Sequence, residues 1–199
     1  MKIYDISQEI SQDMVVYGDT EKVCITELSE IQKGSSYNMT RISMTGHTGT
    51  HADAPLHFID GGLSLDSLPL DCFYGMANLI HVKPVIRDVT KEDLLPLDIW
   101  AGDILLLNTG QKALKPEAAA YLAEKRIKTL GIDSLSVDAF DSIEYTAHLI
   151  LLENNIPIVE GLLLDNIPEG LYEFSALPLK IKNGNGSPVR AILVDRHIN

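Results

Sequence analysis

Apolar residues in the first half of the chain occur in short segments, which is the pattern of β-strands. The segment 38–45 alternates polar and apolar side chains, as a half-buried strand does. The segment 103–107 is a compact apolar run after Ala101 and Gly102, which predicts an inner strand. Residues 2–6, 23–28 and 77–82 have the same β-strand character.

The second half of the chain contains two segments with the composition of helices. Pro116 opens the first, alanines and Leu122 follow, and basic residues end it at 125–128. The second, at about 142–154, is apolar nearly all round, so we expect it to be largely buried. Strands are expected at Ile132, at 156–160 and at 189–194. With no repeat or linker, this order predicts one α/β domain over residues 1–199, with a mixed sheet, antiparallel strands and a few helices.

The chain of 199 residues carries a formal net charge of −12. A surface this acidic repels polyanions, so we expect neither nucleic acid nor an anionic membrane as a partner. Cys24 and Cys72 lie outside any CxxC spacing, which favours a reducing compartment without a disulfide framework. The first ten residues lack the apolar core of a signal peptide, and no apolar run is long enough to cross a bilayer. We therefore expect a cytoplasmic protein.

Three of the six histidines fall within the sequence GHTGTHADAPLH at residues 46–57. Composition alone predicts about a third of a histidine in a window of eleven residues. A lone histidine is more often a core or surface residue than a ligand. The grouping of His47, His51 and His57 with Asp53 reverses that balance and indicates a metal site.

The spacing of this cluster indicates a ligand loop rather than a helix. Glycines and Pro55 interrupt regular structure and let the backbone curl around an ion. His51 and Asp53 are two residues apart and share a face where the stretch is extended. Imidazole and carboxylate ligands without thiolate favour Zn²⁺, Mn²⁺ or Fe²⁺. Thr48 and Thr50 are either hydrogen-bond donors behind the ligands or simply strand residues.

This segment resembles the HxGTHxDxPxH signature of the cyclase family, which includes bacterial kynurenine formamidases and isatin hydrolases. Similar pieces extend along the chain, at residues 102–110, 131–136 and 176–191. The resemblance implies a swivelling β/β/α architecture, which agrees with the predicted order of strands and helices. It also implies a metal-dependent hydrolase of a small-molecule substrate that forms a homodimer, a tetramer or another homo-oligomer.

The family also places a histidine on a helix and a glutamate after the next strand, which correspond here to His148 and Glu160. Taken alone, His148 is a polar residue in an apolar helix and Glu160 a carboxylate that ends an apolar strand. Burying either without a partner costs several kcal/mol, on the order of any unsatisfied polar group or charge. A metal ion is one partner that would satisfy both side chains. The alternative is that His148 forms a hydrogen bond to a backbone carbonyl and Glu160 is solvated. His81 and His197 have no comparable context.

The resemblance further implies two divalent ions per chain, Zn²⁺ or Mn²⁺, that share the aspartate of the signature. The ligand sets that it implies are His47, His51 and Asp53 for one ion, and Asp53, His148 and Glu160 for the other. It leaves His57 as the general acid/base of the reaction. That role requires a group that titrates near neutral pH.

One segment departs from the family. Formamidases of the family carry Trp-Pro-Gly-Asp near the N-terminus, with the Trp in the substrate pocket, whereas residues 15–19 here are Val-Val-Tyr-Gly-Asp. Trp100, the only tryptophan, is expected in the core or an interface. The sequence therefore does not identify the substrate.

Three functions remain in view. The first is the hydrolysis of a small amide or formamide, with aromatic ones included, as in arylformamidases. The second is cyclic amide or lactone hydrolysis, as in isatin hydrolases, and the third is metal binding without turnover. His57 disfavours the third function, because a closed structural site needs no spare histidine beside it.

Overall fold

The computed structural model describes residues 1–18, 21–82 and 86–196. Its centre is one large mixed sheet. The strands of this sheet are β1 (Lys2–Asp5), β4 (His51–Asp53), β5 (Tyr74–His81), β6 (Ile104–Asn108), β7 (Thr129–Ile132), β8 (Ile158–Glu160), β9 (Gly170–Ser175), β10 (Gly186–Pro188) and β11 (Ile192–Asp195). Their order is β1-β11-β9-β5-β6-β7-β8-β4-β10. Strands β2 (Cys24–Ser29) and β3 (Met39–Ser43) form a separate two-stranded sheet.

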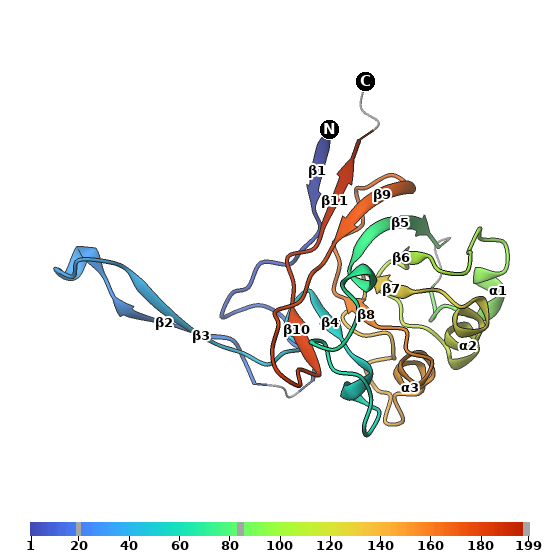
Figure 1. Cartoon of the computed structure of the whole chain (residues 1–199), viewed down its shortest axis with the longest axis horizontal. Coiled ribbons are helices and arrows are strands. Elements are labelled where there is room, and N and C mark those ends of the chain that lie inside the picture. The colour runs from blue at the N-terminus through green and yellow to red at the C-terminus, as the bar shows by residue number, and fades with distance from the viewer. Residues whose placement is uncertain (19–20, 83–85, 197–199) are drawn as a thin grey trace.

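The helices cover one side of the large sheet (Figure 1). They are α1 (Lys91–Leu94), α2 (Pro116–Lys125) and α3 (Thr146–Glu153), with three short 3-10 turns at Ile31–Lys33, Pro55–His57 and Leu70–Cys72. The four central strands β5 to β8 are parallel, with α2 between β6 and β7 and α3 between β7 and β8. The outer strands on both sides pair antiparallel.

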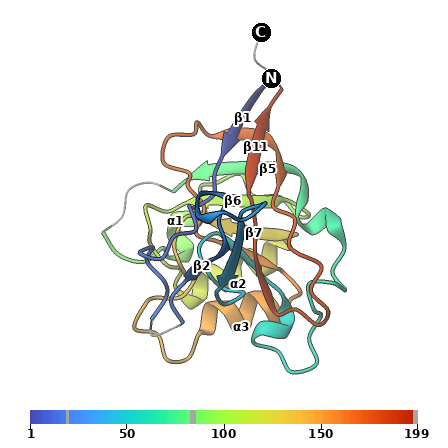
Figure 2. The same ribbon diagram turned by 90° about the vertical axis from the view of Figure 1, so that its left-hand side faces the viewer.

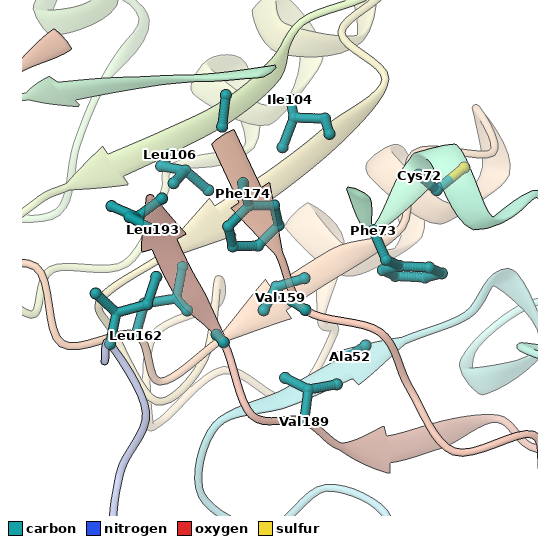
Figure 3. Close-up of a cluster of buried hydrophobic side chains, with 14 of the residues drawn as sticks. Ala52, Cys72, Phe73, Ile104, Leu106, Val159, Leu162, Phe174, Val189 and Leu193 are labelled. Carbon is teal, nitrogen blue, oxygen red and sulfur yellow. The ribbon is translucent and has the colours of Figure 1, made fainter. Parts of the chain in front are cut away.

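The inner strand β6 shows why the sheet has a core on each face. All five of its residues are buried, as is typical of a parallel strand covered on both sides. Leu105 and Leu107 belong to the cluster that packs under the helices. Ile104 and Leu106 point the other way, into the cluster around Phe174 that Figure 3 shows. The predicted inner strand at 103–107 is thereby confirmed, with its bounds shifted by one residue.

The predicted mixed α/β class is confirmed, and so are most of the predicted elements. Three predicted starting points were wrong by three residues or more. Strand β5 begins at Tyr74 rather than at 77. The second helix begins at Thr146 rather than near residue 142, because Tyr145 has a left-handed backbone (φ 49°) that a helix cannot continue. The last strand begins at Ile192 rather than at 189, because Val189 instead donates its N–H to the carbonyl of Thr50.

Strands β4, β9 and β10 have no counterpart among the predicted elements. The segment expected to be a ligand loop is thus partly strand, and its extended part confirms that His51 and Asp53 share a face. Trp100 is 68% exposed, so it does not belong to the core. Both cysteines are free. None of the helices in the described part of the chain combines the length and apolar composition that a bilayer crossing needs.

Candidate functional site

Two neighbouring strands near one end of the large sheet, β4 and β8, hold three of the predicted ligands. Strand β4 pairs antiparallel with β8, and this register sets His51 directly opposite Glu160. The Nε2 atom of His51 lies 3.4 Å from an oxygen of Asp53 and 3.4 Å from an oxygen of Glu160. Ala52, between the two ligands, points to the opposite face and joins the core (Figure 3). Because side chains alternate between the two faces of a strand, His51 and Asp53 lie on the same face.

Helix α3 brings the fourth residue, His148, to the same place. Its Nε2 atom lies 3.2 Å from Glu160 Oε1 and 3.6 Å from Asp53 Oδ2. Its Nδ1 atom lies 2.7 Å from Asp138 Oδ2, and the Asp138 carboxylate also accepts the backbone N–H groups of Ala147 and His148 at 2.9 and 3.0 Å. Asp138 therefore caps the helix and aims the His148 ring at the cluster.

His47 comes from the turn that precedes β4. Its Nδ1 atom lies 2.7 Å from Asp53 Oδ1, and its Nε2 atom lies 3.2 Å from Asn185 Oδ1. The ring lies so close to Gly186 that a Cβ atom there would be 2.2 Å from His47 Cε1. Thr50 holds the turn in place by donating its hydroxyl to the carbonyl of Gly161 at 2.7 Å, which favours the structural reading of this threonine.

The ligating atoms of these residues form two groups in which every pair lies within 4.8 Å. One group is His47, His51 and Asp53, and the other is Asp53, His148 and Glu160. They are the two sets that the family resemblance implied, and Asp53 belongs to both.

The burial of Asp53 tests whether a metal fits. The residue has 0% exposure, and its Oδ2 atom has no hydrogen-bond partner among the described residues. An orphaned carboxylate oxygen in a buried site is costly, and a cation removes that cost. Imidazole and carboxylate donors at these distances are those that Zn²⁺ or Mn²⁺ accepts, so the residues present fit a divalent metal.

The shifted pKa values of the buried histidines also favour a cation in the cluster. Burial acts to lower the pKa of His51, but the nearby Asp53 and Glu160 carboxylates outweigh it and raise that pKa to about 9. Burial also opposes the charge on His148, whose pKa is nevertheless raised well above its ordinary value by Glu160, Asp138 and Asp53. The carboxylates thus create a strong local preference for positive charge.

A cavity of about 380 Å³ opens onto the cluster, with His47, His51, His148 and Glu160 in its wall. The rest of its lining is mostly aromatic or apolar, namely Tyr17, Thr45, His57, Phe58, Leu135, Ser136 and Tyr145. A volume of this size holds a small organic molecule, since ligand pockets span roughly 300–1,000 Å³.

His57 lies in this wall, in the 3-10 turn that follows β4. Its ring stacks on that of His47, with centroids 3.8 Å apart and planes at 19°, and packs edge-on against Phe58 at 4.4 Å. Burial lowers the pKa of His57 to about 4, against the opposing effect of Asp53. The ring is therefore neutral at pH 7, and its pKa lies below the near-neutral range expected of a general acid/base.

Of the two histidines outside the predicted site, the structure describes His81. His81 ends strand β5, and its Nε2 atom is buried without a hydrogen-bond partner among the described residues. His197 lies outside the described residues. The sequence offered no signal for Asp138 or Asn185, whose partners are distant in the chain. Gly186 lies within a segment that resembles the family, but nothing in the sequence indicated its contact with His47.

Tyr17, in the segment that departs from the family's Trp-Pro-Gly-Asp, lines the cavity. The Tyr17 hydroxyl lies 3.4 Å from the carbonyl oxygen of Ala139, and its ring packs edge-on against Phe140 at 5.3 Å. Phe58 and Tyr145 contribute two more rings, with centroids 5.3 Å apart. The cavity therefore keeps an aromatic wall without the tryptophan.

Known proteins are similar to this chain over nearly its whole length. The Cyclase family, described as "Putative cyclase", matches residues 4–139. The kynurenine formamidase of Salinibacter ruber is 36% identical, with 98% of each chain covered, and that of Bacillus mycoides is 35% identical, with 95% of each covered. Among solved structures, a predicted metal-dependent hydrolase from Bacillus stearothermophilus superimposes with a TM-score of 0.87 at 33% identity, covering 98% of each chain. Isatin hydrolase A from Labrenzia aggregata superimposes with a TM-score of 0.83 at 27% identity. The match covers 96% of this chain and 93% of that one.

The chain shares its mixed α/β fold with these proteins, and it has a buried His/Asp/Glu cluster at the base of a cavity. Together these features place it among the metal-dependent hydrolases. Within that class, the chain belongs to the cyclase family.

Proposed function

We propose that this protein hydrolyses the C–N bond of a small aryl amide or formamide, as an arylformamidase does. The observation that carries the proposal is the buried Asp53 carboxylate, which joins two groups of ligating atoms at the base of a cavity with an aromatic wall. The likeness to two kynurenine formamidases, at 36% and 35% identity, supports the same reaction class.

Two divalent ions, Zn²⁺ or Mn²⁺, complete the proposed site. His47 and His51 would hold one ion, and His148 and Glu160 would hold the other. Asp53 would bind both ions. When bound, such ions polarise a carbonyl oxygen and make water acidic near neutral pH. The two groups of atoms within 4.8 Å support a pair of ions that share one carboxylate.

His57 is the proposed general acid/base. Because its ring is neutral, it can accept a proton from water and return it to the departing amine. The stacking on His47 holds the ring beside the ligands without making it one of them. Tyr17, Phe58 and Tyr145 would contact the aryl group and exclude water from it.

Hydrolysis of a cyclic amide or lactone is the second candidate. The likeness to isatin hydrolase A from Labrenzia aggregata, at 27% identity, favours it, and the cluster of ligands would serve either reaction. A metal-binding protein without turnover is the third and weakest candidate, because the cavity and the unligated His57 would then serve no purpose.

A substrate panel distinguishes these candidates. The protein is stripped of metal, reconstituted with Zn²⁺ or Mn²⁺, and assayed on formanilides, on isatin-type lactams and on aryl lactones. We expect formanilides to be cleaved fastest and only after reconstitution. Faster cleavage of the cyclic substrates would select the second candidate, and no turnover on any substrate with both sites loaded would select the third.

The protein is further proposed to be a cytoplasmic homo-oligomer, a dimer or tetramer. Two free cysteines suit a reducing compartment.

A further inference from the structure

Two asparagine–glycine pairs follow one another just before strand β10. They are Asn183–Gly184 and Asn185–Gly186. Both asparagines are exposed, and the segment lies at the end of the large sheet, on the outside of the molecule (Figures 1 and 2). An asparagine before glycine is prone to deamidation, because glycine has no Cβ atom to hinder ring closure.

This reaction needs neither an enzyme nor a cofactor. The backbone nitrogen of the glycine attacks Cγ of the asparagine, and the new Cγ–N bond closes a succinimide ring. The Cγ–Nδ2 bond breaks, and the leaving nitrogen takes the proton of the attacking one and departs as ammonia. Water then opens the ring at either carbonyl, which gives aspartate or an isoaspartate whose main chain is one carbon longer.

The nitrogen of Gly186 is free to make this attack. Gly186 lies opposite Asp53, and the next ladder bond runs from the N–H of Ala54 to the carbonyl of Asn185 at 2.9 Å. Residues that lie opposite each other beside such a bond form a non-hydrogen-bonded pair, whose N–H groups point away from the partner strand. β10 ends the sheet order, so no described strand lies on its other side to accept this N–H.

The other pair is held differently. The N–H of Gly184 donates to the carbonyl of Ile181 at 3.0 Å, so its nitrogen has to break a hydrogen bond before it can approach Asn183. The two pairs have the same sequence and both asparagines are exposed. Asn183 is therefore an internal control for Asn185.

The side chain of Asn185 contacts a proposed metal ligand. Its Oδ1 atom lies 3.2 Å from Nε2 of His47, and because a carboxamide oxygen only accepts, the imidazole is the donor. This hydrogen bond draws electrons from Cγ of Asn185 and favours attack on it. It also leaves Nδ1 of His47, which lies 2.7 Å from Asp53, as the nitrogen for a cation.

A change at Asn185 would be transmitted to His47 by two routes. Isoaspartate lengthens the main chain just before Gly186, whose backbone abuts the His47 ring so closely that a Cβ atom there would be 2.2 Å from Cε1. The lengthening therefore moves the backbone against which the ring rests. Aspartate keeps the main chain unchanged and still offers an acceptor to Nε2.

We propose that Asn185 is a deamidation site and that its conversion to isoaspartate releases the ion held by His47, His51 and Asp53. The effect on the ion rests on the proposed two-ion site, whereas the location of the modification does not. Deamidation at Asn185 thus ties the metal content of the protein to its age.

The test follows metal-reconstituted protein during incubation in warm, mildly alkaline buffer. Peptide mapping by mass spectrometry in water enriched in heavy oxygen locates each new acid, and isoaspartyl methyltransferase distinguishes isoaspartate from aspartate. Anion exchange separates the deamidated form, which has gained a negative charge, and elemental analysis gives its metal content. Asn185→Gln, which closes a ring far less readily, and Asn185→Asp, which adds the charge without lengthening the chain, are measured fresh and aged beside it.

We expect acid to form about 2–10-fold faster at residue 185 than at residue 183, the factor that one hydrogen bond on the competing nitrogen is worth. The isoaspartate fraction should retain one ion of two, while both variants keep their fresh metal content on ageing. Equal rates at the two asparagines, or an isoaspartate fraction that retains both ions, would overturn the proposal. Fresh protein that binds no metal would instead contradict the proposed function and the effect on the ion, and the rates at residues 183 and 185 would still decide the modification itself.

Discussion

Asp138 Oδ2 accepts a hydrogen bond from Nδ1 of His148 at 2.7 Å, while the other ring nitrogen of His148 faces Asp53 and Glu160. This contact keeps a proton on Nδ1 and leaves the Nε2 lone pair available to a cation. Asp138 also accepts the first N–H groups of α3, so one carboxylate fixes both the helix and the ring that the helix carries. Asp138 is therefore a positioning residue, which would act on a bound metal through His148.

Asp138→Asn should weaken metal binding about 10–100-fold, the usual cost of losing a carboxylate behind a ligating histidine. The amide can donate to Nδ1 of His148 and so shift the ring proton to Nε2, where it blocks a cation. Competition against a chromophoric chelator measures the affinity, and nitrogen NMR of the ring reports the tautomer.

Asp133→Asn is the matched control for Asp138→Asn. Asp133 is also a buried carboxylate that accepts backbone N–H groups, those of Thr109 and Gln111, but it contacts none of the proposed ligands. We expect it to lower the melting temperature without changing metal affinity. If Asp138→Asn bound metal as tightly as the wild type, Asp138 would be a helix cap only.

Asp53→Ala should weaken metal binding more than any other single ligand substitution. Its carboxylate belongs to both groups of ligating atoms, and its loss removes the negative charge that separates two cations. Elemental analysis after dialysis should find neither ion, whereas His47→Ala should retain one. Full metal content in Asp53→Ala would show that the carboxylate is not shared.

Gly186→Ala should disturb one half of the site selectively. The added methyl group would lie 2.2 Å from Cε1 of His47, so the ring has to leave its contact with Asp53. We expect the bound metal to fall from two ions to one, since His148 and Glu160 do not touch Gly186. Gly184→Ala is the control, because its methyl group would lie 3.2 Å from Ile181 and away from the ligands. Two ions retained in Gly186→Ala would mean that His47 is not needed for metal binding.

The sequence predicted those parts of the structure whose cause is local. A compact apolar run indicated β6, and Pro116 with the alanines after it indicated α2. Alternation indicated the strand β3, but the half-buried position that it predicted was wrong, because all five residues of β3 are exposed. The cluster at residues 46–57 indicated a metal site, because composition predicts far fewer histidines in a window of eleven residues than the three found there beside an aspartate.

Contacts between distant residues could not be predicted in this way. The start of α3 depends on a carboxylate nine residues before Ala147, and no pattern inside the helix shows it. Strand β10 is three residues long and exists only because β4 lies beside it. The closeness of Gly186 to His47 likewise requires the register of the folded sheet.

The role of His57 separates catalysis from metal binding, and one substitution tests it. If His57 moves the proton and binds no metal, His57→Ala should keep both ions and the fold, while activity falls on the order of 10²–10⁴-fold. The ring stacks on His47 at 3.8 Å, so some loss of packing is expected as well. His57→Gln is therefore measured beside it, because glutamine fills more of the space without transferring a proton at neutral pH. Elemental analysis gives the metal content, and the rate on a formanilide gives the activity. Loss of metal together with activity in both variants would make His57 a ligand, and unchanged activity would make it a packing residue.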